Sequence, residues 1–215
     1  MNEPFVCIFD IETQCLFEDI VACSRDEQSQ RMPISCASTL CIASNLILDD
    51  KSTAEECIER GVLKTFWRDG AAGQDMTALV ALLNRAEMIV GYNLFGFDYK
   101  VLAKHRVDAD DPARWRDKTL DVFCRVRDHA KQWPKLDNLL FLNKIPAKLG
   151  DGKLAVILWR EGRREELGAY CEGDVLATAR LALLRELRFA PDAPPLPNGL
   201  FGAAAALAGF RHTID

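Results

Sequence analysis

Two acidic residues, Asp10 and Glu12, follow directly on the apolar residues 5–9, and this spacing suggests chemistry. An uninterrupted apolar run is typical of a strand buried on both faces. Residues two apart on a strand point to the same side, so both carboxylates are expected to face one spot. Neighbouring carboxylates repel each other unless a positive charge, such as a divalent metal ion, lies between them. A lone pair of this kind is more often a solvated acidic turn, so the metal interpretation needs partners elsewhere in the chain.

A third acid, Asp98, lies in the segment GYNLFGFDYK at residues 91–100. It follows a short apolar strand and begins a predicted helix, and in open α/β sheets ligands bind beyond such strand ends. Asn93 adds a polar side chain, Gly96 permits close approach of the backbone, and Phe97 offers an aromatic surface for stacking. The competing interpretation is that Asp98 only satisfies free amides at a helix N-terminus.

The last pair of candidate residues is Tyr170 and Asp174 in the segment YCEGDV. They are four residues apart on a predicted helix and therefore share one face. That face also carries leucine and alanine residues, so it is expected to point inward. Burying an aspartate is costly without a partner. The competing interpretation is a tyrosine hydrogen-bonded to an acid inside the core.

Four acids and one tyrosine suit phosphodiester hydrolysis assisted by metal ions. Magnesium prefers carboxylate oxygens and keeps several waters, and two ions about 4 Å apart stabilise the attacking and the leaving oxygen. We expect Asp10 to bridge the two ions. Glu12 and Asp174 would complete the first, and Asp98 would support the second. Tyr170 would orient the attacking water, and because an unperturbed tyrosine has a pKa near ~10, a role as base would require the metal to acidify that water.

At these residues the chain resembles the DEDD superfamily, also called DnaQ-like 3′–5′ exonucleases. FDIET, NLFGFD and YCEGD match its three exonuclease motifs in order. The tyrosine at position 170, where another branch has histidine, is typical of the DEDDy branch, which includes the proofreading domains of family B DNA polymerases. The resemblance covers most of residues 5–187. It is strongest to stand-alone ribonuclease H-like proteins, with further matching segments at 31–35, 148–152 and 159–162.

The resemblance implies an α/β protein with a ribonuclease H-like fold, a mixed β-sheet flanked by helices. It implies two Mg²⁺ or Mn²⁺ ions, held by Asp10, Glu12, Asp98 and Asp174, with Tyr170 positioning the water. The expected reaction releases nucleotides from the 3′ end of DNA or RNA, and the expected partner is a single strand with a free 3′ end. By the same similarity, residues near the terminal nucleotide would be Thr13, Asn93 and Phe97.

Composition agrees with one sizeable globular domain, because the 215 residues are 49% hydrophobic and 27% charged. We expect the exonuclease domain in residues 1–190, followed by a proline-rich turn and a tail, residues 191–215. The net charge of −5 argues against coating nucleic acid by bulk charge. Basic residues gather in 100–131 and 144–164 and are either solvated faces or the lining of a groove for a phosphate backbone.

Eight cysteines without a C-x-x-C pair fit neither a zinc module nor a disulfide framework. The N-terminus does not resemble a signal peptide, and no apolar stretch is long enough to cross a membrane. We therefore expect a soluble intracellular protein of a reducing compartment, in the cytoplasm or close to the chromosome.

The hydrophobic pattern predicts strands early in the chain and mainly helices later. Strands are expected at 5–9, 62–67 and 88–91, with an antiparallel pair in 34–48 that turns near 43–45. Residues 14–31 are expected to form a loop or short helix over the acidic site. Helices are expected at 52–60, 74–86, 97–105, 119–131, 136–144, 151–160 and 165–187.

Other functions stay open. The same chemistry could serve an exoribonuclease that trims RNA, because the choice of sugar depends on contacts to the 2′-hydroxyl. A non-catalytic nucleic-acid-binding protein that retains the fold is disfavoured by the intact acids, and a metal titration would detect it. A resolvase-like endonuclease is disfavoured by the Tyr170–Asp174 pair, and a circular substrate would test it.

Overall fold

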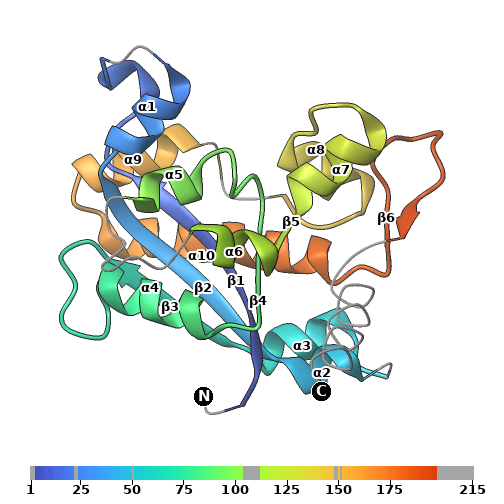
Figure 1. The fold of residues 1–215 in the computed structure, drawn as a ribbon. Helices are drawn as coiled ribbons and strands as arrows, with labels where there is room; N and C mark the ends of the chain where they lie inside the picture. The colour runs from blue at the N-terminus through green and yellow to red at the C-terminus, as the bar shows by residue number, and fades with distance from the viewer. Residues whose placement is uncertain are drawn as a thin grey trace.

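A five-stranded mixed sheet with the order β3-β2-β1-β4-β5 forms the centre of the computed structural model (Figure 1), which describes residues 3–21, 24–49, 51–103, 112–147, 150 and 152–197. The strands are β1 (Phe5–Thr13), β2 (Ile34–Ala43), β3 (Val62–Trp67), β4 (Met88–Gly91) and β5 (Thr119–Asp121). β2 runs antiparallel to β1 and β3, whereas β1, β4 and β5 are parallel to one another. This is the strand order of the ribonuclease H-like fold, so the predicted fold class is confirmed.

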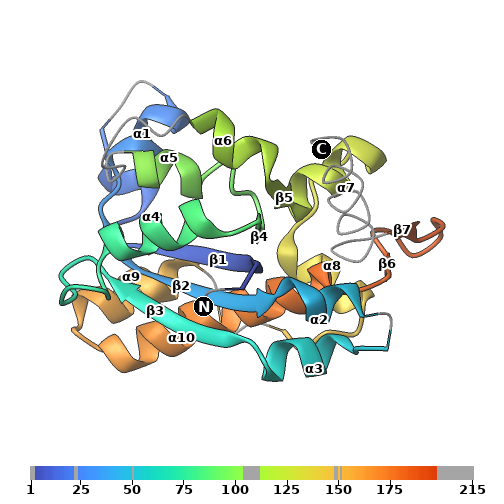
Figure 2. The same cartoon turned by 60° about the horizontal axis from the view of Figure 1, so that its bottom comes forward.

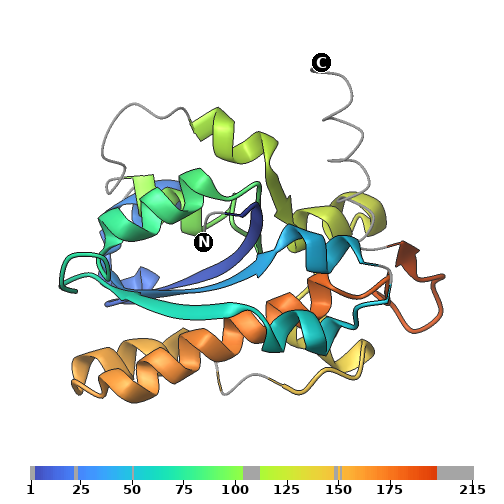
Figure 3. The ribbon, with the colours of Figure 1, turned by 90° about the horizontal axis from the view of Figure 1, so that it is seen from below.

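Helices cover both faces of this sheet, as Figures 2 and 3 show. The helices are α1 (Arg25–Arg31), α2 (Ser44–Leu48), α3 (Ala54–Glu59), α4 (Met76–Arg85), α5 (Asp98–Leu102), α6 (Pro112–Asp117), α7 (Val122–Ala130), α8 (Leu136–Leu142), α9 (Gly152–Arg160) and α10 (Arg164–Ala182). A short 3₁₀ helix, η1, spans Phe17–Asp19. In Figure 3 the orange α10 runs along one face of the sheet, and the green α4 lies on the other. None of the described helices is long and apolar enough to cross a bilayer.

Strand β1 is buried on both faces, as its apolar run predicts. Its odd-numbered residues 5–11 pack with α4 and α5, whereas Val6 and Ile8 pack with α10 on the other side. The strand therefore forms the boundary between two core layers. A register shift between Glu12 and Thr13 interrupts its pairing with β2 just after the second acid.

The expected antiparallel pair in residues 34–48 is wrong. Ile34–Ala43 form one strand, β2, and the expected turn is instead the start of helix α2 at Ser44. The strand is longer than expected because it pairs along its whole length with β1 and along much of it with β3. Each edge of β2 thus already has a partner, and the chain needs no hairpin there.

The expected helix at 119–131 is wrong at its start and confirmed from residue 122 onward. Thr119–Asp121 pair in parallel with β4, and α7 follows directly. The carboxylate of Asp121 caps α7 by accepting the backbone N–H of Cys124 at 3.2 Å. A strand of three residues is too short to show a periodic pattern, so helical spacing dominated the prediction.

The long C-terminal helix ends earlier than the expected residue 187. α10 stops at Ala182, and Glu186–Leu187 form a strand, β6, that pairs with β7 (Leu196–Pro197). The other expected helices and strands are confirmed with ends shifted by a few residues, except that the expected helix at 97–105 extends beyond the described residues from 104. The sequence pattern did not indicate α6. The tail after Pro197 lies outside the described residues.

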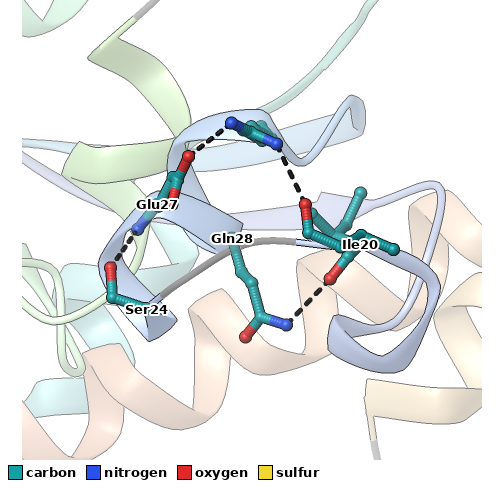
Figure 4. A network of polar contacts seen from close by, with 6 residues as sticks. Ile20, Ser24, Glu27 and Gln28 are labelled. Atoms are coloured by element: carbon teal, nitrogen blue, oxygen red, sulfur yellow. Dashed lines mark hydrogen bonds and ion pairs between the residues drawn. The ribbon is translucent and has the colours of Figure 1, made fainter.

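Residues 14–31 form η1 and α1, which agrees with the expected loop or short helix. The Ser24 hydroxyl caps α1 by accepting the Glu27 N–H at 3.2 Å, and the Gln28 amide donates to the Ile20 carbonyl at 2.9 Å (Figure 4). Arg31 at the end of α1 pairs with Glu27 and also donates to the main chain before the helix. These bonds tie α1 to the segment that leads away from β1.

Candidate active site

The end of β1 places Asp10 and Glu12 beside helix α10. They continue the face of Val6 and Ile8, which packs against that helix, so they point to the same layer. Glu12 is buried and Asp10 is half-buried. The predicted common orientation of the two acids therefore follows from a strand that is buried on both faces.

Helix α10 supplies Tyr170 and Asp174 from its buried side. Both side chains are almost fully enclosed, as their positions on an inward face predict. The Tyr170 hydroxyl lies 3.5 Å from the carbonyl oxygen of Gly150, a long contact for a hydrogen bond. The ring is 1% exposed, so packing also helps to hold the phenol in place.

The turn after β4 brings the segment with Asn93 and Asp98 to the same place. Asn93 adopts the left-handed conformation with φ of 63°, which asparagine tolerates better than most residues. Its side chain lies over Gly96, where an added Cβ would meet the Asn93 Oδ1 at 2.1 Å. A side chain at position 96 would therefore clash with Asn93, and Asp98 begins α5 two residues later.

These segments line one open cavity of about 300 Å³. Its lining residues come from β1, the turn after β4, α5, α7, the loop before α8, α9 and α10. They are Asp10, Ile11, Glu12, Tyr92, Asn93, Phe97, Asp98, Phe123, Pro134, Gly152, Tyr170 and Asp174. All four predicted acids and the predicted tyrosine are among them, together with two of the three predicted substrate contacts. Thr13 is not among the lining residues, and its hydroxyl donates to the Cys15 carbonyl at 3.0 Å.

Asp98 shows most clearly that the cavity suits a cation. The residue is 2% exposed, and burial, followed by the nearby Asp10, raises the pKa of its carboxyl well above the ordinary value. The backbone N–H of Ile11 donates to this carboxylate. Its Oδ1 atom is buried without a hydrogen-bond partner among the described residues. A buried carboxylate oxygen of this kind, beside other acids, fits the oxygen donor set that Mg²⁺ and Mn²⁺ prefer.

An unexpected thiol lies beside the first two acids. Ligand atoms of Asp10, Glu12 and Cys171 all fall within 4.8 Å of one another, and in the described part of the chain they are the one such group. Burial raises the pKa of the Cys171 thiol well above its usual value, so it stays protonated, and Mg²⁺ prefers oxygen ligands. Cys171 is therefore a packing neighbour of the acids. Asp98 and Asp174 line the same cavity outside this close group.

Sequence reasoning missed Asp121, which organises the turn that carries Asn93. Its buried carboxylate accepts the backbone N–H groups of Asn93 at 2.9 Å and Phe95 at 3.1 Å, in addition to capping α7. The available signal was an acid just before a helical pattern, a typical N-cap. It was hidden because the helix was expected to start at residue 119, three residues before α7 begins.

Comparisons with known proteins find partial alignments with solved structures of exonuclease I. No protein-family model and no curated protein sequence matches the chain. A product-bound structure of exonuclease I aligns with a TM-score of 0.43 and 13% identity, over 79% of this chain and 46% of that one. A zinc-bound complex of E. coli exonuclease I with single-stranded DNA gives 0.41 and 16%, over 85% and 40%. The E. coli enzyme with a 5cy-dT13 oligonucleotide gives 0.40 and 15%, over 79% and 42%. The chain spans less than half the length of each.

Proposed function

We propose that this protein is a metal-dependent 3′–5′ exonuclease of the DEDDy type, which releases nucleotides from the 3′ end of a single nucleic acid strand. The observation that carries the proposal is the shared cavity: five residues chosen from three separate segments of the sequence all line it. A volume of about 300 Å³ is at the small end for ligand sites and suits one nucleotide.

Four carboxylates would hold the divalent ions, and they are Asp10, Glu12, Asp98 and Asp174. Bound Mg²⁺ or Mn²⁺ would stabilise negative charge on the phosphate and make water a better nucleophile at neutral pH. The protein contributes fixed positions for these oxygens, because Asp10 and Glu12 lie on a central strand and Asp174 lies on a helix packed against it.

The remaining residues would orient the substrate and the water. The Tyr170 hydroxyl is the candidate for positioning the attacking water, since its ring is enclosed and the residue lines the cavity. The Phe97 ring would stack on the terminal base, and the Asn93 amide would bond to the sugar or phosphate. Tyrosine at position 170 also supports the assignment to the DEDDy branch.

The test uses single-stranded DNA and RNA of one sequence, labelled at the 5′ end and incubated with Mn²⁺, with Mg²⁺ or with chelator. A ladder that shortens from the 3′ end, needs metal and is lost in Asp10→Ala supports the proposal, and the better substrate identifies the preferred sugar. Glu59→Gln is the matched control, because this exposed acid lies on α3 outside the cavity lining. Metal binding without cleavage of either strand would refute the exonuclease and favour a binding protein.

A further inference from the structure

A second cavity, of about 370 Å³, opens between α7, α8 and residues 189–191, and its exposed aromatic side chains are unusual. Trp133 is 78% exposed and Phe141 is 82% exposed, yet both line this cavity. Large aromatic side chains held in water at a hollow surface commonly mark a binding site. The loop and helix that carry them lie beside β5, in yellow-green to yellow in Figure 1.

This second cavity lies next to the candidate active site. Pro134 lines both cavities. The ring of Phe123, which lines the active-site cavity, has its centroid 5.6 Å from the Trp133 ring and 5.8 Å from the Tyr92 ring. The Tyr92 hydroxyl donates to the Pro134 carbonyl at 2.8 Å and fixes this connection. A row of aromatic rings thus leads from the active-site cavity to the second one.

The charge of this region suits a phosphate backbone. Between residues 122 and 145 the chain carries five basic and two acidic side chains, although the whole protein has a net charge of −5. The Arg127 guanidinium lies 5.9 Å from the centroid of the Trp133 ring, and Lys131 and Lys135 are exposed on either side of that tryptophan. Cations placed beside stacking surfaces are typical of sites for single-stranded nucleic acid.

Polar groups in the second cavity suit the edges of bases. Gln132 and Asn138 line it, and each side-chain amide both donates and accepts hydrogen bonds. The rest of the lining is mainly apolar, including Phe189 and Leu142. An apolar wall can stack on the flat face of any base, and the two amides can bond to different base edges. Such a site therefore binds strands of different base sequence.

We propose that the second cavity binds and stacks bases of the strand upstream of its 3′ end, so that the enzyme holds a longer stretch than the nucleotide it removes. This inference rests on the proposed exonuclease function and names the substrate as an unpaired strand. Nucleic acid is favoured over a protein partner because the second cavity shares Pro134 with the lining of the active-site cavity and is bordered by basic residues. A protein surface would not require either feature.

The test measures binding and turnover of Trp133→Ala and Phe141→Ala, with Val62→Ala as matched control. Val62 is 53% exposed on β3, the opposite edge of the sheet from β5. The substrates are an oligothymidylate of about 12 nucleotides, within the usual span of ~4–16 for such sites, and a dinucleotide, which extends beyond the active-site cavity by one nucleotide only. Binding of the longer strand is measured in chelator by fluorescence anisotropy.

We expect Trp133→Ala to raise the Kd and the KM for the longer strand by about 5- to 150-fold, the loss that corresponds to one stacked base. Its kcat and its kinetics on the dinucleotide should match the wild type, and Val62→Ala should change nothing. Phe141→Ala should also raise the Kd for the longer strand. Because both side chains are exposed, all variants should keep the melting temperature.

Two outcomes would overturn this inference while leaving the exonuclease intact. One is that Trp133→Ala raises the KM equally for the longer strand and for the dinucleotide. The other is that both variants bind the longer strand with unchanged affinity. Sedimentation provides a further check. If the wild type is a dimer and Trp133→Ala is a monomer, the second cavity is instead an interface between two copies of the chain. If the wild type cleaves nothing with metal, the proposed function fails, and binding in chelator still tests the stacking site on its own.

Discussion

The carboxylate of Asp121 accepts the backbone N–H of Asn93 at 2.9 Å and thereby holds a residue with a φ of 63° in the lining of the cavity. Asp121 itself is not among the cavity-lining residues. It ends β5, begins α7 and binds the turn after β4, so one side chain joins three elements around the site.

We therefore predict that Asp121→Ala lowers the free energy of unfolding by about 2–4 kcal/mol, because buried N–H groups lose a charged acceptor. Asp121→Asn keeps one acceptor oxygen, so its stability and kcat should lie between those of the wild type and the alanine variant. Denaturant unfolding and single-turnover rates measure the two effects. Equal kcat for both variants would argue against a positioning role for Asp121.

Asp98→Asn should stabilise the metal-free protein at neutral pH. The pKa of the Asp98 carboxyl is raised by burial, so in the folded state this group retains a proton at pH values where the unfolded chain has lost it. The free energy of unfolding of the metal-free wild type should therefore fall as the pH rises above the unfolded pKa of about 4. Asp98→Asn should lack this loss of stability with rising pH. Melting temperatures between acid and neutral pH test it, with a change of about 2–4 °C for each kcal/mol in a chain of this size.

The same variant should lose most of the rise in melting temperature that Mn²⁺ produces in the wild type, because one ligand is gone. Glu59→Gln should retain the full rise. If Asp98→Asn destabilises the metal-free protein at neutral pH, the carboxylate is stabilised by its surroundings and our account of its pKa is wrong.

Tyr170→Phe should reduce kcat by about 10²-fold while leaving the fold and metal affinity unchanged. The ring is 1% exposed and stays packed in the core, so the substitution removes one oxygen atom and keeps the packed ring. The magnitude is that of a well-placed group acting on a proton or a water. Rates under single-turnover conditions and Mn²⁺-dependent melting measure the two properties. An unchanged rate would assign the positioning of water to another group.

Gly96→Ala should disturb the site without unfolding the protein. An added Cβ would come within 2.1 Å of the Asn93 Oδ1, and a flexible side-chain end moves more easily than backbone. We expect a raised KM with a melting temperature close to the wild type. A normal KM would show that the Asn93 amide does not contact the substrate.

Gly173→Ala should stabilise the protein by about 0.5–1 kcal/mol with normal turnover, because glycine is unfavourable inside a helix. Gly173 lies within α10, and a Cβ there would meet no heavy atom within 4 Å. Thermal or denaturant unfolding measures the gain. A destabilised variant would mean that α10 packs more tightly at this point than its surroundings indicate.

The strand β1 and the positions of its two acids were predictable from the sequence, because the two-residue alternation of side chains along a strand accounts for both. Apolar residues followed by acids two apart specify a buried strand and a shared direction, and the structure confirms both. The Tyr170–Asp174 pair was predictable from its spacing as well, since four residues equal about one helical turn. Their gathering in one cavity was expected from the family resemblance.

Other features depend on tertiary contacts that the local pattern does not encode. β5 has three residues, and it is a strand only because β4 offers a parallel partner. Asp121 reaches back to Asn93 across 28 positions, and no spacing rule connects them. The second cavity combines α7, α8 and residues 189–191, so Trp133 resembled an ordinary loop residue.

Side chains along β1 point alternately to the two faces of the sheet, and this alternation also determines where the chain tolerates a change of length. Inserting or deleting one residue before Asp10 would exchange the two faces, turning both acids toward α4 and α5 and presenting Phe9 and Ile11 to α10. Such a change would inactivate the protein even if every side chain were retained. The register shift between Glu12 and Thr13 is the first point at which β1 already accommodates an irregularity. Relatives and engineered variants should therefore differ in length only beyond Glu12, and vary in side-chain size before it.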